Sequence, residues 1–346
     1  LCRQAHARGI RVILDGVYSH TGSNSPYFNR EGQFDSVGAY NSKESPYFSW
    51  YTFQHWPDQY TCWWNFDTLP TVNKLDPAFV RFIIEDEDSV VAHWMKLGAD
   101  GFRLDVADEL PDDFIEKIRA AVKSHGEDKL LLGEVWEDAT TKEAFGRRRT
   151  YLRGHGLDAV MNYPFRSATL DYGADVTAVA DALMQICEHY PAPALNCAMN
   201  FLSTHDTERA ITAIAGEPCN GHDRYWQSKR VIPSGQMDEA IRRLLLGYAM
   251  IFTLPGVPCV YYGDEIAMQG YRDPFNRAFF DWNSTEQRLR GPIKTLAALR
   301  RSCDAFDGGR LEIVRAEGDI LHYRRVGIVQ TAEIILNRGP HLIAEE

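Results

Sequence analysis

The 346-residue sequence lacks the features that mark several classes of protein. It has no uninterrupted apolar run near the roughly 18 residues of a membrane-spanning helix. Its most apolar stretch, 244–263, is broken by Pro255, Gly256 and Pro258. Basic residues are also not in excess, because 37 Lys and Arg face 48 Asp and Glu and give a net charge of −11. These absences argue against a membrane protein and against a surface for nucleic acid or anionic lipid.

The seven cysteines are odd in number and have no CxxC or Cys/His spacing of a metal site. Scattered cysteines are typical of buried free thiols in a reducing compartment, so we expect a cytoplasmic protein. The sequence opens at Leu1 without a methionine or a visible secretory signal. We therefore interpret it as a piece of a longer chain.

Short apolar runs alternate with helix-period segments, which is typical of a βα repeat with a parallel sheet. Six strands are predicted, at 11–15, 100–105, 130–135, 157–162, 198–203 and 257–262. The clearest helices are predicted at 78–97, 111–125, 175–189 and 237–252. A closed barrel of this type has eight strands, so either two strands lie before Leu1 or the sheet is open.

Two regions depart from the repeat, an irregular stretch at 21–75 and shorter alternating runs from about 304 onward. The alternating runs predict a separate antiparallel β domain that stops before it is complete. We therefore expect barrel residues at 1–20 and 76–303, an insertion at 21–75 and a partial C-terminal β domain at 304–346.

Acidic residues follow three of the apolar runs: Asp105, Glu134 and Asp206. Carboxylates are costly where a buried strand meets the surface, so three in equivalent positions suggest one site at the carboxyl ends of the strands. Asp105 and Glu134 are 29 positions apart, about one βα unit, and should end adjacent strands. Adjacent strands lie about 4.8 Å apart, which suits the pair of carboxyl groups about 5–5.5 Å apart in retaining glycosidases.

Arg103 stands two positions before Asp105 and therefore points to the same side of its strand. A guanidinium there is expected to keep Asp105 ionised as a nucleophile. Glu134 as general acid has to stay protonated part of the time, helped by Trp136 and a dry cleft.

Four segments occur in the order of the four sequence regions of the α-amylase family: 15–20 (DGVYSH), 101–109 (GFRLDVADE), 133–136 (GEVW) and 201–206 (FLSTHD). Two more resemble that family's fifth region and its eighth barrel strand, at 69–73 (LPTVN) and 256–265 (GVPCVYYGDE). The resemblance extends from residue 10 to about 285.

The resemblance implies an α/β fold, a (β/α)8 TIM barrel in which 15–20 ends strand three. Strands one and two would then precede this chain, and 21–75 would be the family's domain B insertion. Asp105 would be the nucleophile, Glu134 the general acid/base and Asp206 the third acid, which grips sugar hydroxyls. The role of Asp206 comes from the resemblance alone.

The resemblance also implies a substrate site. The −1 sugar subsite would be lined by His20, Arg103 and His205. Segments 69–73, 133–136 and 271–277 (YRDPFNR) look like those of the cyclomaltodextrinase, neopullulanase and amylopullulanase group. Such enzymes cleave α-1,4 and in some cases α-1,6 bonds of malto-oligosaccharides, cyclodextrins or pullulan. Trp136 would touch acceptor-side sugars, and Asp273 and Arg277 the donor side.

No cofactor is required by this chemistry. The family's first region usually has an Asn before its His, and in calcium-dependent members that Asn binds a structural calcium. Ser19 takes that position here, and because a hydroxyl is a poorer ligand, calcium is disfavoured there. The expected partner is an α-glucan oligosaccharide, with no nucleic acid and no membrane. A homodimer of the full-length protein stays open.

Several polar residues have a structural explanation instead. Asp15 is expected to hold a turn or bond Arg103, and His20 and His205 are alternatively framework histidines. Four further acids are interpreted as orienting or capping groups: Glu109, Glu137, Asp264 and Glu265. Ser203 and Thr204 are expected to be strand-end hydrogen bonders, since no nucleophile elbow surrounds them.

The inserted segment holds ten aromatic residues between positions 47 and 66. Their rings either form a hydrophobic cluster or reach sugar, and we expect one or two to do the latter. Lys74 and the run at 147–149 are expected to be solvated surface charge.

Two alternatives to hydrolysis remain from the sequence. A glucosyltransferase or isomerase of the same family would exclude water from the covalent intermediate. A non-catalytic carbohydrate-binding relative would not need all three acids, whose presence argues against it.

Overall fold

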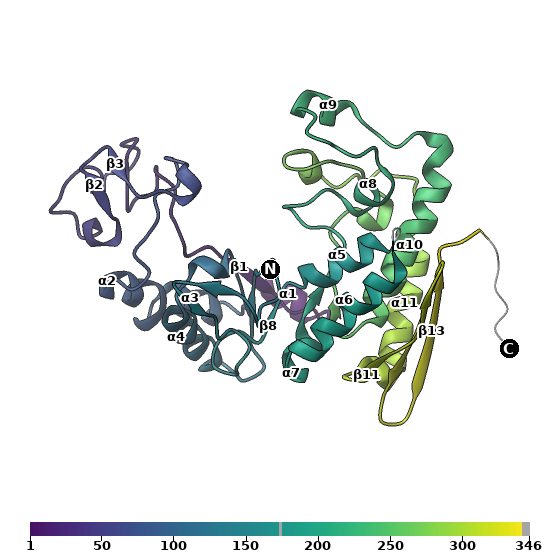
Figure 1. The fold of residues 1–346 in the computed structure, drawn as a ribbon. Helices are drawn as coiled ribbons and strands as arrows, with labels where there is room; N and C mark the ends of the chain where they lie inside the picture. Colours follow the sequence, from purple (N-terminus) through teal and green to yellow (C-terminus); the bar gives the residue numbers. More distant parts are fainter. Residues whose placement is uncertain (173–174, 341–346) are drawn as a thin grey trace. The chain divides into compact units, whose positions relative to one another are not determined.

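The computed structural model describes residues 1–172 and 175–340, which fold as two compact units (Figure 1). Unit 1 consists of residues 1–135 and 139–160, and unit 2 of residues 136–138 and the chain from Met161 onward. The barrel residues expected at 76–303 therefore contribute to both units.

The centre of unit 1 is a parallel sheet with strand order β1-β4-β5-β8. Its strands are β1 (Ile13–Gly16), β4 (Gly101–Leu104), β5 (Leu130–Gly133) and β8 (Ala159–Val160). All four residues of β4 are buried, which is expected for a strand of a parallel sheet that is covered on both faces. Leu104 pairs with Gly16 on one side and with Gly133 on the other, so neighbouring strands end level. Four of the six predicted strands are confirmed here.

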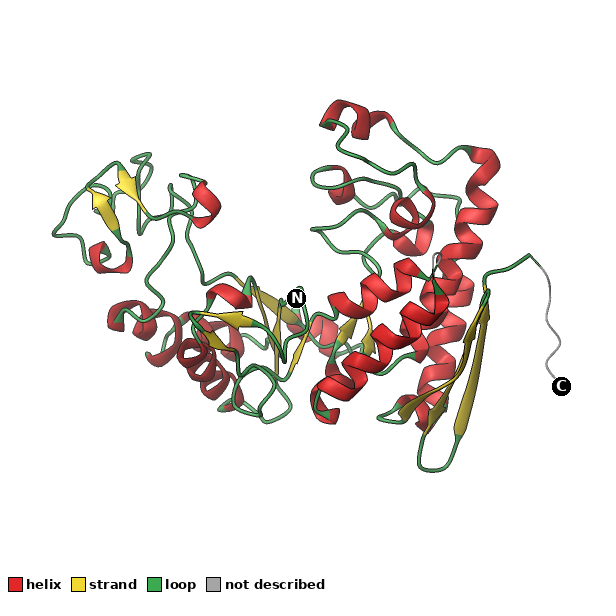
Figure 2. Ribbon diagram, viewed as in Figure 1, coloured by secondary structure: helices red, strands yellow, loops and turns green. Residues whose placement is uncertain are grey.

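Helices of unit 1 accompany this sheet (Figure 2). They are α1 (Cys2–His6), α2 (Pro77–Val80), the π-helical turn η3 (Arg81–Glu85), α3 (Val90–Lys96), the 3-10 turn η4 (Ala107–Glu109) and α4 (Asp112–Lys123). The helix predicted over 78–97 is wrong in its middle, because Asp86 is extended. The Ser89 hydroxyl accepts the Ala92 amide and starts a new helix, a local bond that competes with helix continuation.

The inserted segment is largely irregular, as predicted. It contains a short hairpin of β2 (Phe53–His55) and β3 (Gln59–Tyr60), and the 3-10 turns η1 (Phe48–Trp50) and η2 (Trp63–Asn65). Phe28 is fully buried, and the rings of Tyr51 and Tyr60 pack edge-on against it at 4.8 and 4.7 Å. Much of the aromatic segment therefore forms a hydrophobic cluster.

A second hairpin of unit 1, β6 (Glu143–Ala144) and β7 (Arg147–Arg148), was not predicted. The expectation of solvated charge at 147–149 is wrong for Arg149, whose side chain is fully buried. Its guanidinium pairs with Asp112 at 2.8 Å and lies 4.4 Å from the centre of the Tyr151 ring. A buried arginine needs a charged partner, and Asp112 is 37 positions away in the sequence.

Unit 2 contains the two remaining predicted strands, β9 (Met199–Asn200) and β10 (Val257–Pro258), which pair in parallel. Met161 forms a further parallel bridge to Met199. The helices are α5 (Tyr163–Asp171), α6 (Val176–His189), α7 (Ala192–Cys197), α8 (Ala210–Ala215), α9 (Arg224–Lys229), α10 (Met237–Thr253) and α11 (Arg290–Ser302). Helix α10 supplies much of the core, including Leu244, Tyr248 and Ile251.

The chain then forms the predicted antiparallel sheet, a meander of β11 (Arg310–Glu317), β12 (Ile320–Val326) and β13 (Thr331–Asn337). Short 3-10 turns precede it: η5 (Ser234–Gln236), η6 (Asp264–Ile266), η7 (Phe275–Arg277) and η8 (Asp304–Phe306). Residues 341–346 of the expected β domain lie outside the described residues. In the described part of the chain, no helix has the length and apolar character to cross a membrane.

Candidate active site

Arg103 is the centre of a cluster of carboxylates in unit 1. Its Nη1 atom lies 2.7 Å from Asp15 Oδ1 and 2.7 Å from Asp105 Oδ1, and its Nη2 atom lies 2.8 Å from Glu134 Oε2. The side chain of Arg103 is only 10% exposed, so these pairs are poorly screened by water. The structure thus brings together Asp105 and Glu134, as their spacing predicted. It also confirms that Asp15 bonds Arg103.

The two acids stand one residue beyond paired strands. The Asp105 amide donates to Gly16 O, and the Glu134 amide donates to Leu104 O at 2.9 Å. These bonds extend the parallel ladder by one residue on each strand. The carboxylates are therefore held on backbone that the sheet already fixes.

Val106, the residue after Asp105, has an unusual backbone conformation. Its φ of 41° and ψ of 56° are left-handed, which is a genuine outlier for a β-branched residue. This conformation lets the Val106 amide donate to Glu134 Oε2 at 2.9 Å. Strain of this kind costs on the order of 1–3 kcal/mol and tends to occur at functional sites. Here it links the nucleophile candidate to the acid candidate.

Burial, rather than Arg103, dominates the electrostatics of Asp105. Removal from water raises the pKa of Asp105 above its ordinary value, and Glu134 and Asp15 act in the same direction. Arg103 lowers this pKa, as the sequence predicted, but does not outweigh burial. The expectation that the guanidinium keeps Asp105 ionised stays a prediction, and Arg103 acts in the expected direction.

His20 is also in unit 1 and is oriented by its neighbours. Its Nδ1 atom is 2.8 Å from Ser19 Oγ, and its ring centre is 5.2 Å from that of Trp63. Burial, followed by the charge of Lys74, lowers the pKa of His20, which favours a neutral imidazole. Backbone pairing with Thr71 fixes the segment that carries it.

Lys74 and Glu109 are two residues whose environment the sequence did not reveal. Lys74 is half-buried rather than solvated, and burial lowers its pKa while Glu109 opposes that shift. Glu109 Oε1 accepts the indole N–H of both Trp63 and Trp64, each at 3.1 Å. Glu109 is therefore an orienting group, as expected. The Trp64 ring remains 73% exposed.

In unit 2, Asp206 lies on a loop with His205. The His205 Nε2 atom is 3.1 Å from Asp206 Oδ2, and Arg277 Nη2 is 3.5 Å from Asp206 Oδ1. Arg277 also pairs with Asp273 at 2.8 Å and donates from Nε to the His205 carbonyl. The four predicted residues of this loop and of 273–277 are thus in one contact network. Asp206 belongs to unit 2, whereas Asp105 and Glu134 belong to unit 1.

Asn276 was not predicted as a site residue. It is fully buried, and its Nδ2 atom lies 2.8 Å from the His205 carbonyl and 2.7 Å from the Thr207 carbonyl. A third carbonyl, of Thr204, is 3.3 Å away. The signal for it was its place within segment 271–277, between two residues that were selected.

A buried polar network lies at the end of β9 and β10. The Ser203 hydroxyl donates to Asp264 Oδ2, and the Tyr248 hydroxyl donates to the same atom at 3.3 Å. Burial raises the pKa of Asp264 to about 6, against the opposing effects of Ser203 and Arg209. Asp264 therefore orients strand ends, as expected.

The other expected capping and bonding residues are in unit 2 as well. Glu265 Oε2 accepts the Gly263 amide at 2.7 Å, which confirms a capping role. Thr204 Oγ1 accepts the Asp206 amide at 3.1 Å, so Thr204 is a hydrogen bonder. Glu137 is exposed.

Trp136 stacks on Tyr163 in unit 2. The ring centres are 4.2 Å apart and the planes differ by 15°. The Trp136 ring is nevertheless 47% exposed, so part of its face is open to solvent. A half-exposed, firmly stacked ring is a suitable platform for the apolar face of a sugar.

The described residues contain no cluster of three or more His, Cys, Asp or Glu side chains placed to hold a metal ion. The Ser19 hydroxyl lies 2.8 Å from His20 Nδ1.

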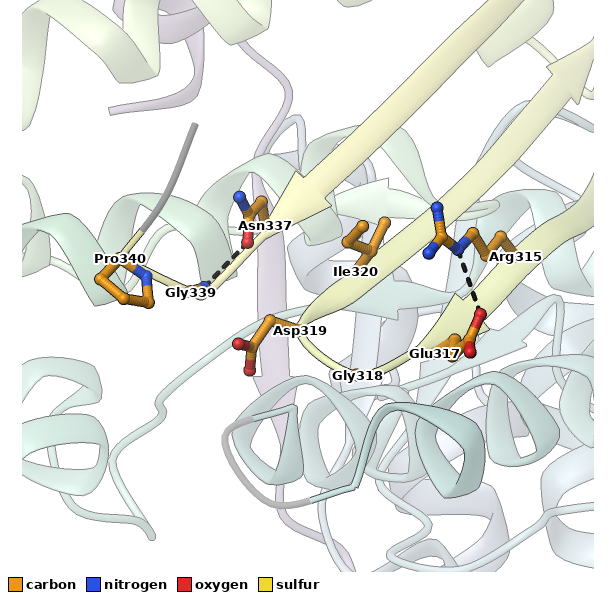
Figure 3. A pocket seen from close by; sticks show the side chains of 8 residues that line it. All are labelled: Arg315, Glu317, Gly318, Asp319, Ile320, Asn337, Gly339 and Pro340. Carbon is orange, nitrogen blue, oxygen red and sulfur yellow. Dashed lines mark hydrogen bonds and ion pairs between the residues drawn. The ribbon is translucent and has the colours of Figure 1, made fainter. Parts of the chain in front are cut away.

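A pocket of about 280 Å³ lies in the C-terminal sheet, and none of the residues that line it is a predicted site residue (Figure 3). Its lining includes Arg315 and Glu317, which form an ion pair at 3.4 Å, and Asp319, which pairs with Arg338. Its charged groups are thus satisfied within the sheet. We do not include it in the candidate active site.

Residues 1–302 match the family described as alpha amylase, catalytic domain. The chain therefore belongs to the α-amylase family, as the four sequence regions indicated. Its fold is accordingly that of this family's catalytic domain, followed by an antiparallel C-terminal sheet.

Named relatives agree with the predicted subgroup. An amylopullulanase of Thermoanaerobacterium thermosulfurigenes is 32% identical over 92% of this chain and 18% of its own length. A cyclomaltodextrinase of Geobacillus thermopakistaniensis is 32% identical over 98% of this chain and 53% of its own length. This chain thus spans about a fifth of the first relative and about half of the second.

Among solved structures, the cyclic α-maltosyl-(1→6)-maltose hydrolase of Arthrobacter globiformis superposes with a TM-score of 0.81 at 29% identity. The match covers 98% of this chain and 70% of that chain.

Proposed function

We propose that the protein is a retaining glycoside hydrolase that cleaves α-glucosidic bonds. The observation that carries the proposal is the contact of Asp105 and Glu134 with one guanidinium, from the ends of adjacent parallel strands. Asp105 and Glu134 follow paired residues of strands β4 and β5, and adjacent strands lie about 4.8 Å apart. This supports the short separation of a retaining enzyme rather than the longer one that admits a water.

In the proposed mechanism Asp105 attacks the anomeric carbon, and a covalent glucosyl-enzyme forms. Glu134 donates a proton to the departing oxygen and then takes a proton from the water that releases the sugar. Arg103 and the Val106 amide converge on Glu134 Oε2. We therefore assign the transferred proton to Oε1 of Glu134.

The other predicted residues are proposed to hold the substrate. His20, Arg103 and His205 line the −1 subsite, and Asp206 grips sugar hydroxyls there. Trp136 contacts acceptor-side sugars. Asp273 and Arg277 contact the donor side.

The proposed substrates are malto-oligosaccharides, cyclodextrins or pullulan, with cleavage of α-1,4 and also α-1,6 bonds. The names of the relatives, amylopullulanase and cyclomaltodextrinase, support this class. The activity of the whole protein is part of the proposal, since this chain spans 18% and 53% of the length of these two relatives. No cofactor is invoked, a cytoplasmic location is proposed from the free thiols, and a homodimer is left to measurement.

We further propose that in the complete protein both parallel sheets belong to one eight-stranded barrel. Support comes from apolar side chains at the open edge of β1, where Ile13 is 36% and Val17 is 44% exposed. A neighbouring strand and its helix would cover such residues. Residues 1–20 and 76–303 form the barrel in this proposal, 21–75 is domain B, and 304–346 is part of a C-terminal β domain.

The test uses the full-length protein with Asp105→Asn and with Glu134→Gln. Each change should lower release of reducing sugar from cyclodextrin, pullulan and starch by orders of magnitude without unfolding the protein. Asp100→Asn is the matched control, because Asp100 lies next to the opposite end of the same strand, where it bonds His6 and Lys129. It should alter stability rather than turnover.

Near-normal turnover in either acid variant would overturn the assignment. Product analysis on maltotriose separates the reaction types. Glucose and maltose indicate hydrolysis, whereas longer chains indicate a glucosyltransferase.

A further inference from the structure

We propose that Asn276 is a positioning residue for Asp206, acting through the backbone of the loop at 204–207. The inference rests on the proposed function, because the position of Asp206 matters only if Asp206 meets substrate. Asn276 itself does not contact the sugar in this proposal.

The carboxamide nitrogen of Asn276 lies within hydrogen-bonding distance of three carbonyl groups of that loop. Its Nδ2 atom lies 2.7 Å from Thr207 O, 2.8 Å from His205 O and 3.3 Å from Thr204 O. An amide nitrogen has two hydrogens, so it satisfies the two nearer carbonyls and shares with the third. These carbonyls flank Asp206 on both sides in the sequence. A shift of the amide would therefore move the Asp206 backbone.

The loop has few other means of fixing its shape. Thr204 Oγ1 accepts the Asp206 amide, and Thr207 Oγ1 accepts the Thr204 amide. These bonds satisfy amide donors of the loop. Of the loop's carbonyls, Thr204 O also accepts the Thr207 amide and His205 O also accepts Arg277 Nε, and Asn276 Nδ2 contacts both of them as well as Thr207 O. Buried carbonyls require a partner, and the loop lies outside helices and strands, where such partners are usually found.

Arg277, the next residue in the chain, contacts the same loop. Arg277 Nε donates to the His205 carbonyl at 3.1 Å, and Arg277 Nη2 lies 3.5 Å from Asp206 Oδ1. Asn276 is fully buried, whereas the side chain of Arg277 is 46% exposed. The short turn η7 thus places a buried anchor beside an exposed arginine. Through this turn, the proposed donor-side residues Asp273 and Arg277 are held in fixed positions relative to Asp206.

The carboxamide oxygen of Asn276 also supports a positioning role for this side chain, beyond its packing. Asn276 Oδ1 is buried and has no hydrogen-bond partner within residues 1–172 and 175–340. An unsatisfied buried acceptor costs roughly 1–3 kcal/mol. The chain therefore tolerates a penalty to keep an N–H2 group at this point, a pattern that is expected near functional sites.

The test is a double-mutant cycle in the full-length protein with an activated aryl α-maltoside as substrate. Asn276→Ala should lower kcat about 100-fold, the loss that a misplacement near 1 Å produces. In an Asp206→Asn background the same change should lower kcat less than about threefold, because a group that acts through Asp206 has nothing left to position. KM should change less than kcat in the single variant, since the exposed donor-side residues remain.

Asn200→Ala is the matched control. Asn200 is also fully buried in unit 2, and its amide donates to the Pro255 carbonyl at 2.7 Å. Asn200→Ala should lower the melting temperature. Any loss of kcat that it causes should be similar in the wild-type and the Asp206→Asn backgrounds. If Asn276→Ala does not fold, Asn276→Ser, which keeps one donor, replaces it in the cycle.

An equal kcat loss from Asn276→Ala in both backgrounds would overturn the inference, since it would indicate general structural damage. Wild-type kcat in Asn276→Ala would overturn it as well. Failure of the proposed function gives a different result, because Asp206→Asn alone would then keep the parent's turnover.

Discussion

Replacing Arg103 with methionine is expected to destabilise the protein by about 3–5 kcal/mol at neutral pH, the usual cost of stranding buried charges. The side chains of Arg103, Asp105 and Glu134 are only 10%, 20% and 7% exposed, so water screens little of their interaction. Asp15 is 53% exposed, and its pair with Arg103 should contribute less than about 1 kcal/mol. The penalty therefore comes from the two candidate catalytic acids.

The loss of stability caused by Arg103→Met should also depend on pH. The ionisation of Asp105 determines whether this loss grows or shrinks as the pH rises. Burial already raises the pKa of Asp105, and Arg103 opposes it, so Arg103→Met should raise this pKa further. A carboxyl whose folded-state pKa exceeds its unfolded value favours folding at low pH and loses that contribution as the pH rises through the folded pKa. The difference between variant and parent should therefore be largest near pH 7 and shrink toward about pH 4.

Urea unfolding followed by tryptophan fluorescence at both pH values measures this, and urea avoids the charge screening of guanidinium. Arg11→Met is the control, because Arg11 and Asp128 form a pair in which both side chains are 61% exposed. Its midpoint should stay close to the parent's. A parent-like midpoint for Arg103→Met, or a penalty that does not vary with pH, would refute the reasoning.

Two further predictions concern residues that the sequence misjudged. Arg149→Met should lower stability in thermal unfolding by roughly 3 kcal/mol, because the buried Asp112 loses its buried partner and keeps the exposed Arg147 at 3.2 Å. Arg148→Met on the exposed hairpin should change stability little. An unchanged melting temperature for Arg149→Met would contradict its role. Lys74→Met should raise the pKa of His20 in an NMR titration, because the ammonium lowers that pKa. A pKa of His20 that stays the same would show that Lys74 does not face it.

Much of the candidate site follows from local pattern. The spacing of Asp105 and Glu134 predicted adjacent strands, and the observed register of Leu104 with Gly133 confirms it. Such predictions succeed because the period of a βα unit and the alternation of side chains on a strand are properties of the backbone itself. The motifs also indicated the family, which the match over residues 1–302 confirms.

Prediction from local pattern was wrong where the structure depends on a contact from elsewhere in the chain, or on a hydrogen bond of a single side chain that interrupts a helix. The helix predicted over 78–97 is interrupted because Ser89 caps a new helix. Arg149 and Lys74 were predicted to be solvated surface charge. The local sequence around a basic residue does not show whether residues distant in the chain will bury it. Asn276 was missed because an asparagine between selected residues carries no chemical signal until the carbonyls around it are known.

Local pattern is sufficient for the order of the strands and for the residues at their ends, because backbone periodicity and short motifs are local. It is also sufficient to predict that Asp105 and Glu134 are neighbours. The environment of these two acids depends on tertiary packing, which provides the three carboxylates on Arg103, the left-handed Val106 that binds Glu134, and the burial that outweighs Arg103 at Asp105. The physical reason is that desolvation and hydrogen bonding depend on atoms far apart in the chain, which packing alone brings into contact.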